Sequence, residues 1–434
     1  MPDVQAPDAA PQVAGDKLSD LMTEVSRFGA TPEGGVDRPA LTDAHRDARD
    51  WLKRTFEARG FQARVDAIGN LFGVLELAGS NAPTILVGSH LDSQPMGGRF
   101  DGAYGVIAAL AAIEAVRDQV QATGQTPACN YAVCDWMNEE GARFQPSLLG
   151  SGVFGGEHSL DFALARQDGD GLAVGDELDR IGYRGTDPAP VPDAYIEVHV
   201  ECGPELERTG RTIGPFERYW GAVKVRAVMI GEQAHTGPTA MALRKDALLG
   251  AAHVVAGLRE MAESASDTLH TSVGRLEVQP NSPNIVPGRA TLFIELRSPS
   301  PETLEAAEAE LDRLLEESAA KAGVEVSVAA RDHRPAGTFD PRLVQLAEAE
   351  AAALGLASMR LDTIGGHDAI PVGRRCPAIV VAVPSVGGVC HNAAEYTAPE
   401  DLLAGANVLV RMLWRLETSS GDLTAAAAPP GAAA

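Results

Sequence analysis

The stretch Thr84–Gly102, which reads TILVGSHLDSQPMGGRFDG, decides the fold. It starts with an apolar run, Thr84–Ser89, that predicts a buried central strand, and a helical pattern follows over Phe100–Val116. A second β-rich run, Asn130–Trp136, comes next. Strand, crossover helix and strand at this spacing predict an α/β fold with a mostly parallel central sheet flanked by helices.

The same pattern continues on both sides of this stretch. Apolar spacing predicts helices over 42–59, 340–354 and 398–416, and strands over 70–77, 195–200 and 378–383. Near Thr212 the order changes to β-α-β-β-α, over 220–230, 244–262, 272–278, 290–297 and 301–320, and 324–328 could add a last strand. This order predicts a smaller, ferredoxin-like α+β domain of two layers, inserted into the larger one. We therefore assign residues 1–211 and 330–434 to the large domain and 212–329 to the insertion.

Composition excludes several classes of function. The 434 residues are 45% hydrophobic and 22% charged, the balance of a soluble globular protein. The formal net charge of −24 argues against binding to nucleic acid or to an anionic membrane surface. The N-terminal stretch 1–14 lacks the basic start and apolar run of a signal peptide. The five cysteines form no C-x-x-C pair, so neither a disulfide framework nor a zinc ribbon is indicated, and a cytoplasmic location is expected.

A histidine and two aspartates follow the first predicted strand. His90 comes at its carboxyl end, where α/β sheets place their active sites. Asp92 is close enough in sequence to orient the imidazole of His90 from behind a metal ion. The glycines that follow let the chain fold back, so that Asp101 meets His90 just before a helix begins. The alternative is a helix-capping aspartate and a histidine that fills a turn, which is favoured for His90 taken alone.

Two adjacent glutamates, Glu139 and Glu140, follow the strand that ends at Trp136. Adjacent carboxylates repel each other unless a cation holds one of them. Neighbours on an extended chain also point to different sides, so one could bind a metal while the other acts as general base on water. A solvated acidic turn is the alternative, and it is favoured for the pair taken alone.

Two further strand ends carry residues of the metal-ligand type. Glu197, His199 and Glu201 share one face of an apolar strand, which is awkward for a core and natural for the wall of a metal site. His391 follows the predicted strand that ends at Val383. Four such strand-end sites in one α/β domain predict a metal centre.

These motifs resemble those of the M20-type metallopeptidase superfamily. The runs that carry the resemblance are GSHLDSQPMGGRFDG, NEEGARF, EVHVECGPELE and CHNAAE. The forms QPxGGxFDG and NEEGxRF are those of its amidase branch, which contains N-carbamoyl-L-amino-acid hydrolases, β-ureidopropionases and allantoate amidohydrolases. The resemblance extends from about residue 40 to residue 415.

The resemblance implies a division of roles at the metal centre. His90 and His199 would hold one divalent ion, Glu140 and His391 a second, and Asp101 would bridge them. Glu139 would be the general base. Two such ions can share a water, lower its pKa and polarise the scissile carbonyl. Oxygen and imidazole ligands suit Zn, Mn, Co or Ni.

The resemblance also implies a second set of residues, on the inserted domain. That domain would serve as lid and dimerisation domain of a homodimer. His235, supplied by the dimer partner, Asn284 and Arg297 would close over the substrate, and Arg297 would grip its carboxylate. Gly365 and His367 match a loop that lines the pocket, with His367 placed behind the ligands. The alternative for Arg297 is a salt bridge with a neighbour such as Glu295.

The sequence departs from the family at Cys202, where glutamine is usual, and at Ile364, where glycine is usual. We interpret both as changes in substrate choice. The expected activity is hydrolysis of a linear C–N amide bond in an N-carbamoyl (ureido) or related N-substituted amino acid, a small carboxylate-bearing substrate. A dipeptidase or N-acyl amino acid deacylase on the same scaffold is the alternative. A non-catalytic binding protein would be expected to have lost Glu139 or a ligand, and all are present.

Overall fold

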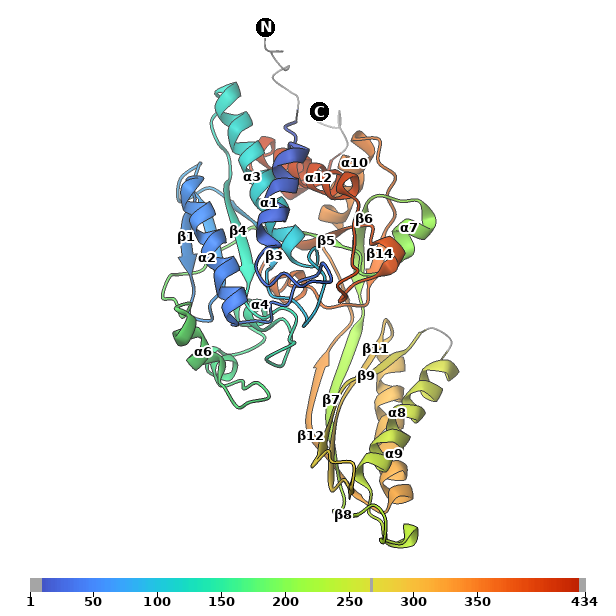
Figure 1. The fold of residues 1–434 in the computed structure, drawn as a ribbon. Helices are drawn as coiled ribbons and strands as arrows, with labels where there is room; N and C mark the ends of the chain where they lie inside the picture. Colours follow the sequence, from blue (N-terminus) through green and yellow to red (C-terminus); the bar gives the residue numbers. More distant parts are fainter. Residues whose placement is uncertain (1–9, 266–267, 429–434) are drawn as a thin grey trace. The chain divides into compact units, whose positions relative to one another are not determined.

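The computed structural model describes residues 10–265 and 268–428 (Figure 1). Most of the stretch that bears on a signal peptide, residues 1–9, lies outside this range. The chain forms two compact units. The first contains Met1–Glu217, Phe339–Leu361 and Gly366–Ala434, and the second contains Arg218–Thr338 and Asp362–Gly365.

A sheet forms the centre of the first unit, with the strand order β1-β2-β4-β3-β5-β15-β6. The four strands β4, β3, β5 and β15 run parallel, and β1, β2 and β6 are antiparallel to their neighbours. The bounds are β1 Gln62–Val65, β2 Leu71–Leu75, β3 Thr84–His90, β4 Asn130–Trp136, β5 Ala194–Val200, β6 Gly214–Tyr219 and β15 Ala378–Val383. The parallel strands are buried on both faces, which explains their continuous apolar sequences.

Helices cover this sheet (Figure 1). The longer ones are α1 Gly15–Val25, α2 Asp43–Ala58, α3 Ala103–Thr123, α10 Pro341–Ala353 and α12 Pro399–Thr418. The shorter ones are α4 Leu149–Gly155, α5 Leu160–Leu164, α6 Val174–Ile181, α7 Glu205–Thr209, α11 Ala369–Val372 and α13 Leu423–Ala427. Thr42 caps α2 by accepting a hydrogen bond from the His45 amide. Gly102 precedes α3 with φ of 64°, and a Cβ there would lie 2.3 Å from the His90 ring, so only glycine fits.

The second unit is a four-stranded antiparallel sheet, in the order β12-β7-β11-β9, with two helices. Its elements are β7 Gly221–Ile230, α8 Ala247–Ser264, β9 His270–Gln279, β11 Arg289–Ser298, α9 Pro301–Ala322 and β12 Glu325–Arg334. Apolar side chains of both helices and of the sheet form a core separate from that of the first unit. Smaller elements of this unit are β8 Ala234–His235, the 3-10 turn η1 Met241–Leu243 and β10 Ile285–Val286. Two more short strands, β13 Gly337–Thr338 and β14 Leu361–Thr363, pair with β6 and extend the larger sheet.

The structure confirms the predicted α/β class and the largely parallel sheet. The predicted helices and strands are present, with shifted ends: α3 continues to Thr123, beyond the expected Val116, and β12 continues to Arg334. Several elements between 141 and 193 and strand β6 were not predicted. Within the described residues, no helix is long and apolar enough to cross a membrane.

Candidate active site

Five predicted ligands meet at one edge of the sheet in the first unit. His90 ends β3, His199 lies near the end of β5, Glu140 follows β4, and His391 follows β15. Because β4, β3, β5 and β15 are parallel, their carboxyl ends lie at the same edge. Asp101 reaches this edge from the loop before α3.

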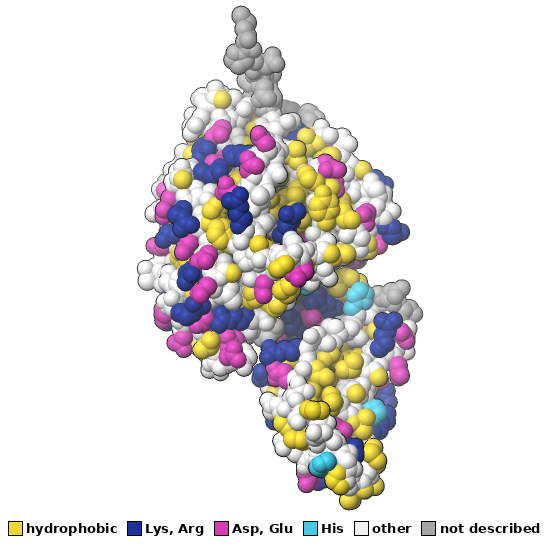
Figure 2. All heavy atoms as spheres, viewed as in Figure 1, with side chains coloured by type: hydrophobic (Ala, Val, Ile, Leu, Met, Phe, Trp, Pro, Cys, Tyr) yellow, Lys and Arg dark blue, Asp and Glu magenta, His cyan; other side chains and the backbone are white. Residues whose placement is uncertain are grey.

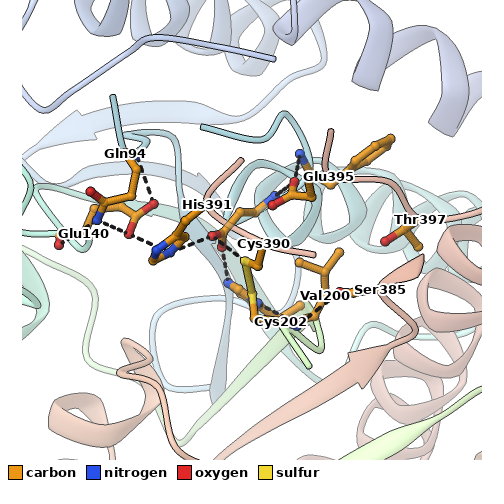
Figure 3. The surroundings of a disulfide bond; sticks show 12 residues. Gln94, Glu140, Val200, Cys202, Ser385, Cys390, His391, Glu395 and Thr397 are labelled. Carbon is orange, nitrogen blue, oxygen red and sulfur yellow. Dashed lines mark hydrogen bonds and ion pairs between the residues drawn. A yellow bond between two sulfur atoms is a disulfide. The ribbon is translucent and has the colours of Figure 1, made fainter. Parts of the chain in front are cut away.

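Asp101 lies between His199 and His391, and each of its two carboxylate oxygens contacts a different histidine. Oδ1 lies 3.1 Å from Nε2 of His199 and 3.9 Å from Nε2 of His90. Oδ2 lies 3.2 Å from Nε2 of His391. The Nε2 atom of His391 also lies 3.2 Å from Oε2 of Glu140, as Figure 3 shows. The five side chains therefore form two groups that share Asp101.

Main-chain carbonyls fix the direction of two of the imidazoles. Nδ1 of His90 lies 2.9 Å from the carbonyl oxygen of Asp92, and Nδ1 of His199 lies 2.8 Å from that of Val200. A carbonyl oxygen only accepts hydrogen bonds, so each Nδ1 carries the proton. The Nε2 atoms that face Asp101 are then free to accept a metal ion.

The carboxylate of Asp92 holds the Glu139–Glu140 turn. It accepts hydrogen bonds from the amides of Glu139 (3.1 Å) and Glu140 (3.3 Å), whereas its Oδ1 lies 3.7 Å from Nδ1 of His90. Asp92 was predicted to orient His90 through its side chain. In the structure it contacts the imidazole more closely through its main chain. Oε2 of Glu139 lies 3.5 Å from Nε2 of His90. Glu140 is held separately, by hydrogen bonds from the amide and side chain of Gln94.

Close contacts among these groups shift their pKa values. Burial would raise the pKa of Asp101, but hydrogen bonds with His199 and His391 outweigh it and hold that pKa well below its ordinary value. Against the effect of burial, the same contacts raise the pKa of His199 to about 9, and contacts with Asp101 and Glu140 raise that of His391 to about 11. Burial, followed by the charges of neighbouring carboxylates, raises the pKa of Glu139 well above its ordinary value. The site therefore favours positive charge beside Asp101.

The residues present fit divalent cations. His90, Asp101 and His199 form one set whose ligand atoms lie within 4.8 Å of one another. His391, whose Nε2 lies 3.2 Å from both Asp101 and Glu140, forms a second set with them. The histidine Nε2 atoms and carboxylate oxygens suit a borderline or hard divalent ion. A cation would supply the positive charge that protons supply at the histidines of the metal-free site.

Glu395 supports the loop that presents Asp101, a role that the sequence did not indicate. Its Oε1 accepts hydrogen bonds from the amides of Phe100 (2.8 Å) and Asp101 (3.0 Å), so it fixes the loop that presents Asp101. Gly98 allows this contact, because a Cβ there would lie 2.1 Å from the Glu395 carboxyl carbon. Burial, followed by the charge of Asp101, raises the pKa of Glu395 to about 7. The only signal in the sequence was its place four residues after His391.

Other polar residues near the centre have supporting contacts. Glu197 is buried and accepts from the Ser89 hydroxyl at 2.8 Å, and Glu201 accepts from the amides that begin α7. Of the three residues predicted on one face of β5, only His199 therefore contacts Asp101. The ring of His367 meets that of His199 edge-on, with centroids 4.7 Å apart. His367 thus lies behind a predicted ligand.

Cys202 and Cys390 form a disulfide, with Cα atoms 5.0 Å apart. The cysteine spacing did not indicate this disulfide. The two cysteines are 188 residues apart and meet only because the loops after β5 and β15 are neighbours in the folded sheet, which their spacing cannot reveal. Sγ of Cys390 lies 3.2 Å from Oδ2 of Asp101.

The predicted substrate residues of the second unit lie at opposite ends of its sheet. His235 pairs with Ile285 in the ribbon of β8 and β10, next to Asn284, beyond the Arg289 end of β11. Arg297 lies at the other end of β11, eight residues on, a distance of about 27 Å along an extended strand. Its guanidinium donates to the Ile364 carbonyl at 2.6 Å and forms an ion pair with Glu295 at 2.8 Å.

The salt bridge considered as the alternative for Arg297 is therefore present. It occupies one edge of the guanidinium fork, and Nη1 is held by the Ile364 carbonyl. The carbonyl of Gly365 accepts from Arg334 at 3.4 Å. The loop 362–365, which belongs to the second unit, is thus held by two arginines of that unit.

Comparisons with known proteins agree on one family. The profile of peptidase family M20/M25/M40 matches residues 86–415. An N-carbamoyl-L-amino-acid amidohydrolase of Rhizobium meliloti is 36% identical, over 95% of this chain and 99% of its own. An allantoate amidohydrolase of Bacillus subtilis is 30% identical, over 92% of this chain and 97% of its own. The crystal structure of an amidase of the hydantoinase/carbamoylase family from Burkholderia vietnamiensis is similar, with a TM-score of 0.90, 36% identity and coverage of 96% and 98%.

Proposed function

Because the chain belongs to peptidase family M20/M25/M40, we propose that it is a metal-dependent amidohydrolase that cleaves the linear C–N amide bond of an N-carbamoyl (ureido) or related N-substituted amino acid. The observation that carries this proposal is Asp101, whose two oxygens face histidines on different sides. Relatives named as N-carbamoyl-amino-acid and allantoate amidohydrolases support the class of bond.

Two divalent ions complete the proposed site. His90 and His199 would hold one ion, Glu140 and His391 the other, and Asp101 both. Zn, Mn, Co and Ni all suit these ligands. When bound, such ions would lower the pKa of a water molecule and polarise the scissile carbonyl.

Glu139 is the proposed general base. Its carboxylate lies 3.5 Å from Nε2 of His90 and is buried, whereas Glu140 is engaged with His391 and Gln94. Burial raises the pKa of Glu139, which gives this carboxylate a stronger affinity for a proton. It would take a proton from the attacking water and pass it to the departing nitrogen. Asp92, which holds the amide of Glu139, would keep it in place.

The second unit would supply the substrate contacts and the dimer interface. Arg297 would bind the substrate carboxylate, and the separation of Arg297 from His235 and Asn284 supports the idea that His235 acts from a partner subunit. Figure 2 shows hydrophobic side chains on the surface of this unit, where a second copy would cover them. Its large exposed hydrophobic residues are Ile230, Met241, Leu243, Leu248, Leu249, Val255, Leu276 and Val328. The proposed location is the cytoplasm: Cys129, Cys134 and Cys376 are unpaired, as is usual there, although the Cys202–Cys390 disulfide is of a kind that is rare in that compartment.

A substrate screen tests this function. The enzyme is stripped with a chelator, reloaded with Zn, Mn, Co or Ni, and given N-carbamoyl, N-formyl and N-acyl amino acids, ureido acids and dipeptides. We expect turnover that requires added metal and is fastest with N-carbamoyl or ureido acids. Full activity in the metal-free enzyme would contradict the proposal, and preference for acyl or peptide substrates would assign the chain to the deacylases or dipeptidases.

A further inference from the structure

The Cys202–Cys390 disulfide joins the two chain segments that carry His199 and His391. Cys202 lies two residues after β5, three residues from His199, and Cys390 directly precedes His391. These two histidines face opposite oxygens of Asp101. Figure 3 shows the disulfide beside His391, with Glu140 on the far side of His391. A covalent bond at this place constrains the distance between the two halves of the site.

The loop that carries His391 depends on this constraint. Its start is held by hydrogen bonds from the Cys202 amide to Ser385 and from the Gly387 amide to Glu207, and its end by Glu395. His391 lies between these anchors, with a side chain that is 52% exposed. It has a φ of 53°, in the left-handed region that non-glycine residues avoid. A tether on the neighbouring residue therefore opposes the tendency of His391 to leave this conformation.

We propose that Cys202 and Cys390 are a reversible redox pair whose disulfide holds His391 in position to bind metal. This inference rests on the proposed metal centre. Reduction by a small thiol breaks the S–S bond in two exchange steps. The first thiolate attacks one sulfur and forms a mixed disulfide, and the second releases the enzyme. Two thiols are oxidised to one small-molecule disulfide, and the two electrons and two protons appear on Cys202 and Cys390 as S–H groups.

The pair has the properties of a redox site. Cys202 is exposed, so a small thiol can reach it, whereas Cys129, Cys134 and Cys376 are buried and unpaired. In a reducing compartment, disulfides are rare and those that occur are usually catalytic or redox-sensing. Cys202 also stands at one of the positions where this chain departs from the family pattern. The bond lies beside His391, where it can alter metal binding.

Metal affinity of the oxidised and reduced full-length protein tests the inference. The reductant is removed under nitrogen, thiols are counted by alkylation and mass spectrometry, and the protein is titrated with Zn²⁺ from a metal buffer. We expect three thiols in the oxidised form and five in the reduced form. The oxidised form should bind two ions, and reduction should weaken the second by about 10- to 100-fold, as disturbing the residues behind metal ligands does. Reoxidation should restore it.

Two variants complete the experiment. Cys202→Ser should bind the second ion with the weaker affinity of the reduced protein under all redox conditions. Cys376→Ser removes a buried cysteine outside the pair and should respond to reduction as the wild type does. Five thiols after mild oxidation would overturn the inference. So would an unchanged affinity on reduction, or a higher one, which would mean that the freed Cys390 sulfur is itself a ligand. Absence of metal from both forms would overturn the proposed function and the redox role with it.

Discussion

Replacing Gly102 by alanine tests how His90 is held at the metal centre. A Cβ at this position would lie 2.3–2.4 Å from Cε1, Nδ1 and Nε2 of the His90 imidazole. The ring is buried and its Nδ1 is fixed by the Asp92 carbonyl. Either the imidazole or the start of α3 must therefore move.

The cost of Gly102→Ala has two parts. The backbone at φ 64° and ψ −53° lies outside the left-handed helical region and would cost an L-residue about 1–3 kcal/mol. Overpacking of a buried site adds about 1–3 kcal/mol. We expect the free energy of unfolding of the metal-free protein to fall by about 2–6 kcal/mol in total. Displacement of His90 should also weaken binding of the first metal ion by roughly 10- to 100-fold.

Gly124, at the other end of α3, provides a control with a positive φ, although its ψ of 16° places it in the left-handed helical region. Its φ is 68°, and a Cβ there would meet nothing within 4 Å. Gly124→Ala should therefore cost only the backbone strain, about 1–2 kcal/mol, and leave metal affinity unchanged. Urea unfolding of chelated protein and titration with buffered Zn²⁺ measure the two quantities. Equal losses of stability in both variants, with wild-type metal affinity in Gly102→Ala, would refute the close packing of Gly102 on His90.

Three further predictions concern the base, the substrate and pH. Glu139→Gln should keep both metal ions by elemental analysis and lower kcat by about 10²- to 10⁴-fold; retained turnover would remove the general-base role. Arg297→Ala should raise KM more for substrates that carry a carboxylate than for the same substrates with the carboxylate converted to an amide. The same rise in KM for both would rule out the carboxylate contact. Burial raises the pKa of Glu395 from 4.5 to about 7, so its contribution to the stability of the metal-free protein is complete below pH 4.5 and is lost as the pH rises through about 7. Glu395→Gln should flatten this part of the stability profile in urea, and a profile identical to that of the wild type would contradict the assignment.

The parallel sheet and the clustering of His90, Asp101, Glu140, His199 and His391 were predictable because both follow from local patterns. Buried strands are continuous apolar runs, and a polar residue at the carboxyl end of such a run is conspicuous. The ends of elements were less predictable. The apolar pattern of α3 is interrupted at Arg117 and Asp118, although the helix continues to the cap at Gly124. The second half of β12 is polar because this strand lies at an edge of its sheet, so alternation stops before the strand does.

Contacts between distant segments were not predictable. The Cys202–Cys390 pair depends on two loops that only the sheet order brings together. The role of Glu395 depends on two main-chain amides almost 300 residues earlier in the chain, and no side-chain pattern marks an amide that needs an acceptor. Asp92 was predicted to act near His90. In the structure its main-chain oxygen contacts the imidazole and its carboxylate holds the Glu139 turn, a division that only the three-dimensional placement reveals.

The length of β11 has a consequence for cells that make two different variants of the protein. Arg297 and His235 lie at opposite ends of this sheet, so one copy of the unit cannot bring both to one substrate. If the partner subunit supplies His235, a copy without Arg297 and a copy without His235 would together rebuild one complete set of groups. Two such defects, each inactivating alone, would complement each other in a cell that makes both versions. Defects at His90 and Asp101 would not, because both belong to the same unit of the same chain.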